Sequence, residues 1–423
     1  MSHRPETIPL PKLEYWELKN KFICVIGAMP QVPLTCFDFW CKAGSAFEEP
    51  GEEGLAHFLE HMVFKGSANL KAGEFDQKIE ALGGSSNAAT GYDDVHFHVL
   101  VPKESALIAL DLLLSLVLEP TIHNEDFALE KEVVLEEIAQ YNDQPDEVVF
   151  QTLLKNCWSN HAYGRPILGI EESLIEMSTD KMKSFHKRRY KPENYCLAIT
   201  GPIPINLRDY LNKRLDRETI NISNIVSEEE YIKHLNFKVG RNVIKIPRLE
   251  SDRIIMAWPI PPAKEQLLMM GVEIATSFLA EGRNSKLVQK LREEMQLVES
   301  IDIGITLLEK GSLIVLEAIC KEGNVNSVED EINKLLLNNI NTEPLKKDIK
   351  KASQQVKNSI IFSLETSYQL AGLAGVKGLW NRREPLQDQF EYINYWTASK
   401  IQKEILILMN PKLSNTLIAK PLI

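Results

Sequence analysis

The sequence lacks three features that would place it in a specialised class of protein. It has no uninterrupted apolar run of about 18 residues, and residues 1–9 contain no apolar signal core, so we expect neither a membrane span nor a secretory signal. Its net charge is −11 rather than positive, which argues against a nucleic-acid surface. These absences predict a cytoplasmic protein that binds neither membranes nor nucleic acid.

Cysteine is also scarce. The six cysteines show no Cys-x-x-Cys spacing, and most stand among apolar neighbours. This pattern is typical of free buried thiols and argues against both a disulfide framework and a cysteine metal site.

What the chain does have is the composition of an ordinary globular protein, with 44% hydrophobic and 25% charged residues. A chain of 423 residues is longer than a single hydrophobic core usually supports, so more than one domain is expected. A polar, charge-rich stretch over 216–250 is typical of a linker. We therefore expect an N-terminal domain over 1–215 and a C-terminal domain over 251–423.

A weak internal repeat indicates that the two domains share a fold. Residues 179–199 and 397–419 each show a helical pattern, a turn with proline and an apolar strand at nearly equal spacing. Strand patterns elsewhere, such as Leu34–Cys41, alternate with helical ones. The predicted fold class is therefore α+β in two duplicated domains, and the second domain lacks the motif described next.

The most informative stretch is the apolar segment 54–64, because it contains three ionisable side chains. As a helix, it places His57 and His61 one turn apart on one face, with Glu60 beside them. Two neutral imidazoles at this spacing can bind one Zn²⁺, and a carboxylate outside the ligand set can accept a proton from the bound water. His-x-x-Glu-His is the inverted form of a common zinc-peptidase motif. The alternative is a core helix whose histidines bond to backbone, but burying unpaired charge is costly.

A second helical pattern, over Glu125–Tyr141, offers a third ligand. At about 100° per residue, Glu130, Val133 and Glu137 lie on its inward, apolar face, whereas Glu136 points to water. We predict that Glu137 completes a His₂Glu zinc site and that Glu130 orients a ligand imidazole from outside it. Judged alone, the pattern also fits an ordinary surface helix rich in glutamate.

Two further histidines lie on the predicted strand Val95–Val101. Side-chain alternation places His96 and His98 together on the face opposite the apolar residues. We interpret them as a solvated or partly covered strand face rather than as metal ligands.

These motifs resemble the pitrilysin or insulinase family of zinc peptidases, which includes the mitochondrial processing peptidases. The resemblance covers most of the chain. It rests on the segments His57-Phe58-Leu59-Glu60-His61, Asn87-Ala88-Ala89-Thr90, the helix with Glu130 and Glu137, and residues 161–169.

The resemblance implies a fold, a cofactor and an activity. The fold would be two similar α+β domains, each a mostly antiparallel sheet flanked by helices. The activity would be that of a zinc-dependent endopeptidase that hydrolyses peptides or unfolded polypeptide segments. Zinc would be held by His57, His61 and Glu137, and Glu60 would be the general base. Such half-length chains pair with a similar subunit to form a closed chamber.

The resemblance also implies residues that bind the peptide substrate. Asn87 and Ala88 would lie on an edge strand to which an extended peptide adds, although a mobile Gly/Ser/Asn loop is the alternative. Arg292 matches an arginine that holds substrate from the second domain. The family's tyrosine seven residues later is replaced by Glu299, and a carboxylate cannot donate a hydrogen bond as a phenol does. We therefore expect a heterodimer with a homologous subunit rather than a homodimer.

Two other functions stay open. One is a non-catalytic scaffold or peptide-binding subunit, which the missing tyrosine favours and the intact set of His57, Glu60, His61 and Glu137 argues against. The other is a purely structural zinc. Structural zinc sites usually close with four protein ligands and favour cysteine, whereas three ligands are found here.

Overall fold

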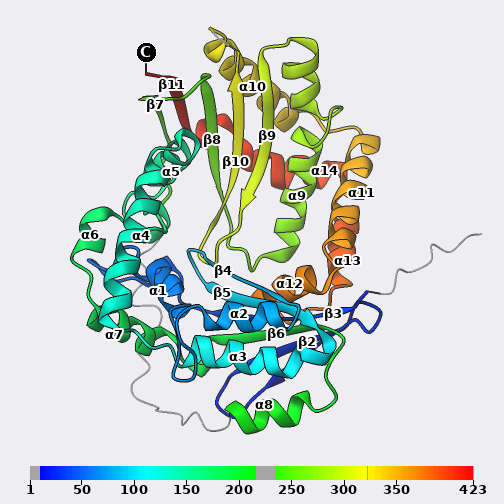
Figure 1. The fold of residues 1–423 in the computed structure, drawn as a ribbon. Coiled ribbons are helices and arrows are strands. Elements are labelled where there is room, and N and C mark those ends of the chain that lie inside the picture. The colour runs from blue at the N-terminus through cyan, green and yellow to red at the C-terminus, as the bar shows by residue number, and fades with distance from the viewer. Residues whose placement is uncertain (1–9, 216–234, 322, 423) are drawn as a thin grey trace, which may run out of the picture.

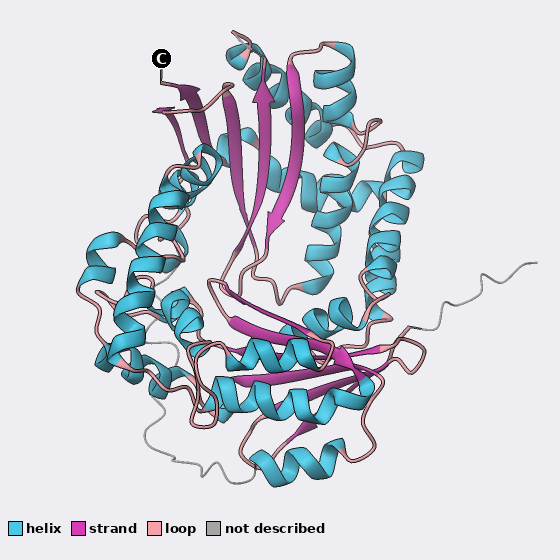
Figure 2. Ribbon diagram, in the orientation of Figure 1, coloured by secondary structure: helices cyan, strands magenta, loops and turns pink. Residues whose placement is uncertain are grey.

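The computed structural model describes residues 10–215, 235–321 and 323–422. It contains two β-sheets that lie in separate layers of the molecule (Figure 1). Helices α4 and α5 run along one side between the layers, and α11 and α13 run along the other. Figure 2 shows helices packed beside the strands in both layers. Within the described ranges, no helix has the length and apolar character needed to cross a membrane.

Among the described residues, the first sheet has six strands in the order β1-β2-β6-β3-β5-β4. All neighbouring strands are antiparallel except β2 and β6. The strands are β1 (Leu13–Glu17), β2 (Ile23–Ala28), β3 (Leu34–Cys41), β4 (Ser85–Thr90), β5 (Val95–Pro102) and β6 (Tyr195–Gly201).

In the part of the chain that the structure describes, the second sheet has five strands in the order β7-β11-β8-β10-β9, again with one parallel pair, β7 and β11. Apart from the extra strand β1, the connectivity of the two sheets is the same. The prediction of two similar, mostly antiparallel α+β units is therefore confirmed. The strands are β7 (Gly240–Ile246), β8 (Arg253–Ile260), β9 (Val298–Thr306), β10 (Ser312–Cys320) and β11 (Asn415–Pro421).

The helices follow the same duplicated plan. In the first half they are α1 (Leu55–Val63), α2 (Glu74–Ala81), α3 (Ala106–Leu118), α4 (Asn124–Asn142), α5 (Pro145–Cys157), α6 (Glu171–Ile175), α7 (Thr179–Arg189) and α8 (Leu207–Leu215). In the second half they are α9 (Gln266–Ala280), the π-helix η6 (Val288–Glu294), α10 (Val325–Asn341), α11 (Lys346–Phe362), α12 (Ser367–Leu379), α13 (Asp388–Tyr395) and α14 (Ala398–Lys400).

Each half of the chain contributes a helix to the sheet of the other half. Helix α12 packs on β2, β3 and β6, where Ala374 shares a buried cluster with Trp40. A Cβ at Gly378 would lie 2.4 Å from Cys196 Sγ, so glycine permits this close approach. Helix α5 packs on β7, β8 and β11 in the same way. The two halves are therefore interlocked, since each covers apolar surface of the other.

The second sheet begins within 216–250, the range predicted to be a linker, because Gly240–Ile246 forms β7. Residues 216–234 lie outside the described residues. All six cysteines are free and buried, as their spacing predicts.

Candidate metal centre

Helix α1 begins where only glycine fits. Gly54 has a φ of 93°, and a Cβ there would lie 2.4 Å from the carbonyl oxygen of Leu168. The buried carboxylate of Glu48 accepts hydrogen bonds from the backbone N–H groups of Gly54 and Ala56, at 3.2 and 2.9 Å. These bonds satisfy donors that the first helical turn leaves unpaired, so the start of α1 is fixed.

The apolar residues of α1 fix which way its ionisable residues point. Leu55, Phe58, Leu59 and Met62 are fully buried in the core of the first half. Because helical neighbours share a face at intervals of three and four residues, the remaining surface of α1 carries both histidines and Glu60 together.

Helix α4 crosses this surface and brings two carboxylates to it. The ring of Phe127 packs against Phe58 of α1, with 4.7 Å between ring centroids. Glu130 is buried, and the side chain of Glu137 is 41% exposed. One expectation is wrong, since Val133 is 51% exposed although the helical phase places it on the inward face.

The two histidines of α1 converge on Glu137. Its carboxylate oxygens lie 3.7 Å from His57 Nε2 and 3.4 Å from His61 Nε2. Ligand atoms about 2.0–2.1 Å from a tetrahedral Zn²⁺ lie about 3.3–3.5 Å from one another. Each histidine therefore lies at nearly the distance from the Glu137 carboxylate that two ligands of such an ion would have.

The position of the ring hydrogen of His61 supports a metal site between His61 and Glu137. Its Nδ1 lies 2.9 Å from a carboxylate oxygen of Glu130, whose other oxygen lies 2.5 Å from Lys65 Nζ. A carboxylate paired with a lysine only accepts, so Nδ1 of His61 carries the hydrogen and donates it. In the neutral imidazole, Nε2 then carries the lone pair, which faces Glu137. Two acceptors facing each other require a proton or a cation between them.

His57 completes the set as a neutral base. Burial, with a smaller contribution from His61, lowers the pKa of His57 to about 4. The imidazole is therefore neutral near pH 7, which is the form that binds metals. In the described residues, its Nδ1 is buried without a hydrogen-bond partner. The donor set and its protonation fit a Zn²⁺ ion.

Glu60 lies beside this cluster and is held by a different contact. Thr90 Oγ1 of β4 donates a hydrogen bond to Glu60 Oε2 at 2.5 Å. Burial raises the pKa of Glu60, and the hydrogen bond from Thr90 offsets part of that rise. A carboxylate with a raised pKa accepts and releases protons more readily near neutral pH.

Two protein-family models match successive parts of the chain. Residues 31–171 match the model described as insulinase (peptidase family M16), and residues 176–356 match that of the peptidase M16 inactive domain. The chain belongs to peptidase family M16. The resemblance predicted from the motifs is thereby confirmed, and the stretch that matches the inactive domain contains no His-x-x-Glu-His.

Curated relatives of this M16 chain include uncharacterized zinc proteases. One from Rickettsia bellii is 27% identical over 285 residues, which are 67% of this chain and 68% of the relative. YmxG from Bacillus subtilis is 25% identical over 365 residues, 84% of this chain and 85% of the relative. These relatives are called zinc proteases, which agrees with the donor set found here.

Solved structures show the same fold. A protease from Helicobacter pylori aligns with a TM-score of 0.88 at 22% identity, covering 98% of this chain and 100% of that one. A peptidase M16 inactive domain from Pseudomonas fluorescens aligns with a TM-score of 0.83 at 18% identity, covering 97% and 98%.

The other residues singled out from the sequence of this M16 chain lie on β4, in the π-helix η6 and on β9. Asn87 and Ala88 are on β4, an edge strand of the first sheet that contacts α1. Arg292 lies in the π-helix of the second half, where its guanidinium pairs with Glu293 at 3.0 Å. Glu299 is exposed on β9, which is an edge strand of the second sheet.

Sequence reasoning missed two partners in the site. Lys65 lies in the turn that follows α1, and its contact with Glu130 depends on how α4 packs against α1. Thr90 belongs to the Asn87-Ala88-Ala89-Thr90 motif, but its contact with Glu60 depends on how β4 packs against α1.

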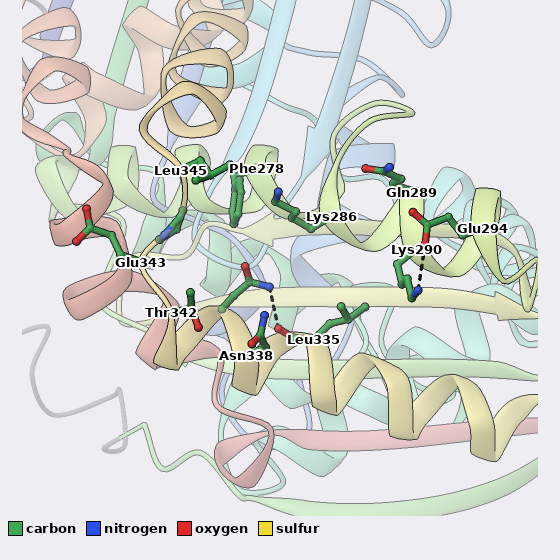
Figure 3. A pocket seen from close by; sticks show the side chains of 12 residues that line it. Phe278, Lys286, Gln289, Lys290, Glu294, Leu335, Asn338, Thr342, Glu343 and Leu345 are labelled. Carbon is green, nitrogen blue, oxygen red and sulfur yellow. Dashed lines mark hydrogen bonds and ion pairs between the residues drawn. The ribbon is translucent and has the colours of Figure 1, made fainter.

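A hollow of about 340 Å³ lies away from this centre, among α9, η6 and α10 (Figure 3). Its lysines already have partners, since Lys290 pairs with Glu294 and Lys286 pairs with Asp348. None of the predicted site residues lines it. We therefore place the candidate active site of this M16 chain at α1 and α4.

Proposed function

We propose that this M16 chain is a zinc-dependent endopeptidase that hydrolyses peptides or unfolded polypeptide segments. The observation that carries the proposal is the convergence of His57, His61 and Glu137, with a fourth ionisable group, Glu60, left outside the set. Three ligands leave one coordination position open, as catalytic zinc sites do. When bound, Zn²⁺ would polarise the scissile carbonyl and lower the pKa of a water molecule.

The residues of the candidate centre have separate roles in this proposal. His57, His61 and Glu137 hold the ion, and Glu130 orients His61 from outside the ligand set. Glu60 accepts a proton from the attacking water and delivers it to the leaving amine. Thr90 fixes the carboxylate of Glu60 in the position from which it does so.

The substrate would bind along β4. An extended peptide pairs with the free edge of a sheet through backbone hydrogen bonds, and this mode of recognition tolerates varied sequences. Asn87 and Ala88 lie on that edge, and β4 contacts the helix that carries both histidines. This proximity supports a role for both residues in binding substrate next to the metal.

A homologous subunit is the proposed partner, in a two-subunit chamber. Arg292 would hold the substrate from the second half, while Glu299 cannot donate a hydrogen bond to a developing oxyanion. A heterodimer whose other subunit supplies that donor is therefore favoured over a homodimer. The same substitution favours the second candidate function, a non-catalytic scaffold or peptide-binding subunit.

Chelation separates the two candidate functions. We expect the purified chain to contain zinc and to cleave an unstructured peptide, alone or with its copurified homologous partner. Treatment with 1,10-phenanthroline should abolish cleavage, and added Zn²⁺ should restore it. Cleavage that is indifferent to the chelator would contradict the proposed mechanism, and zinc without any cleavage in the copurified complex would favour the scaffold.

A further inference from the structure

The first sheet carries a second cluster of possible ligands, on β3 and β5. These strands are antiparallel, and Asp38 lies directly opposite His98. His96 lies two residues away on β5, so both imidazoles project from the same face as Asp38. The two histidine rings are nearly parallel, with 5.9 Å between their centroids.

The polar atoms of this cluster are incompletely paired. Asp38 is fully buried, and its Oδ1 lies 2.9 Å from His96 Nδ1. In the described parts of the chain, Asp38 Oδ2 and His98 Nδ1 are both buried and have no hydrogen-bond partner. Burying polar atoms without partners is unfavourable, so two orphaned atoms in one cluster call for an explanation.

The surroundings hold the two imidazoles in place. Trp40 stacks on His96, with 4.2 Å between centroids and 14° between planes. Tyr368, from the first turn of α12, packs against His98 at 4.7 Å. Each ring is therefore restrained by an aromatic neighbour, and this restraint lowers the entropy cost of binding a ligand.

We propose that Asp38, His96 and His98 bind a second divalent transition-metal ion. One possible ligand atom from each residue lies within 4.8 Å of the others. Two imidazoles and one carboxylate are a donor set for Zn²⁺, Co²⁺ or Fe²⁺, with positions left for water. The site shares no residue with the cluster of His57, His61 and Glu137, so it does not rest on the proposed peptidase activity.

An ion pair between Asp38 and a protonated His96 is the competing interpretation. It accounts for the 2.9 Å contact but gives no partner to Asp38 Oδ2 or to His98 Nδ1. A cation bound within the cluster would accept lone pairs from all three residues. Binding needs a modest side-chain movement, because ligand atoms around a tetrahedral ion lie about 3.3–3.5 Å apart.

The test is the number of Zn²⁺ ions per chain after equilibration with Zn²⁺ and removal of excess metal. We expect two ions for the full chain and for the control His123→Ala, which changes an exposed histidine outside both clusters. His98→Gln should bind one ion and keep peptidase activity sensitive to chelators. A His98→Gln chain that binds as many ions as the full chain would overturn the proposal.

A second measurement does not depend on the folding of the His98 variant. The double variant His57→Gln/Glu137→Gln removes two residues of the first cluster and leaves the second intact. After incubation with Co²⁺ and gel filtration, we expect this chain to retain one ion with the visible absorption of nitrogen and oxygen ligands. Retention of no Co²⁺ would overturn the second site, whereas the proposed peptidase site would be unaffected by that result.

Discussion

Replacing Glu60 with Gln should reduce peptidase activity by roughly 10²–10⁴-fold, the contribution typical of a general acid or base. Glutamine keeps the size of the side chain and can still accept the hydrogen bond from Thr90 Oγ1, but it cannot take up the proton of the attacking water. Glu60 is outside the converging set, so bound zinc should remain at the parent level. Steady-state kinetics and metal analysis of the same sample measure both quantities.

The exposed residue Glu80 of α2 offers a matched control for this variant. Glu80→Gln makes the same chemical change on a surface helix and should leave kcat and the zinc content unchanged. If Glu60→Gln cleaved peptide at the parent rate, another group would have to be the base. If it lost zinc, Glu60 would have to be a ligand, and its assigned role would be wrong.

Replacing Glu137 with Ala should remove both zinc and activity. Loss of a partner that only orients a ligand costs about 10–100-fold in metal affinity, and loss of a ligand should cost more. Glu137 contributes both of the oxygens that face His57 and His61. Competition with a chromophoric chelator measures the affinity, and the peptide assay measures the activity.

Glu136→Ala is the matched control for that experiment. It makes the same substitution one residue earlier on α4, where the side chain is exposed. We expect parent zinc affinity and parent activity from this variant. Equal losses in both variants would indicate that α4 itself was perturbed, and equal retention of zinc in both would contradict the assignment of Glu137.

The sequence predicts much of the candidate centre because each helix fixes the directions of its own side chains, although the contact between α1 and α4 is long-range packing. The spacing of His57 and His61 fixes their separation once α1 is helical, and the phase of α4 separates Glu130 and Glu137 from the exposed Glu136. The phase failed at Val133, because periodicity gives the direction of a side chain and not whether anything packs against it.

Contacts between other segments far apart in the chain cannot be predicted from the sequence pattern. The strand pattern predicts only a solvated or partly covered face for His96 and His98, because Asp38 belongs to a strand some 58 residues earlier and meets them only through the register of β3 and β5. Hydrophobic periodicity likewise does not predict that α5 packs on the second sheet and α12 on the first. Both depend on long-range packing, which a local pattern does not encode.

Anomalous scattering from crystals of the zinc-loaded chain, recorded on both sides of the zinc absorption edge, tests the central claim most directly. We predict a peak about 2.0–2.2 Å from His57 Nε2, His61 Nε2 and a carboxylate oxygen of Glu137, with Glu60 outside the coordination sphere. A zinc-loaded crystal with no peak between α1 and α4, or with Glu60 in place of Glu137 among the ligands, would contradict it.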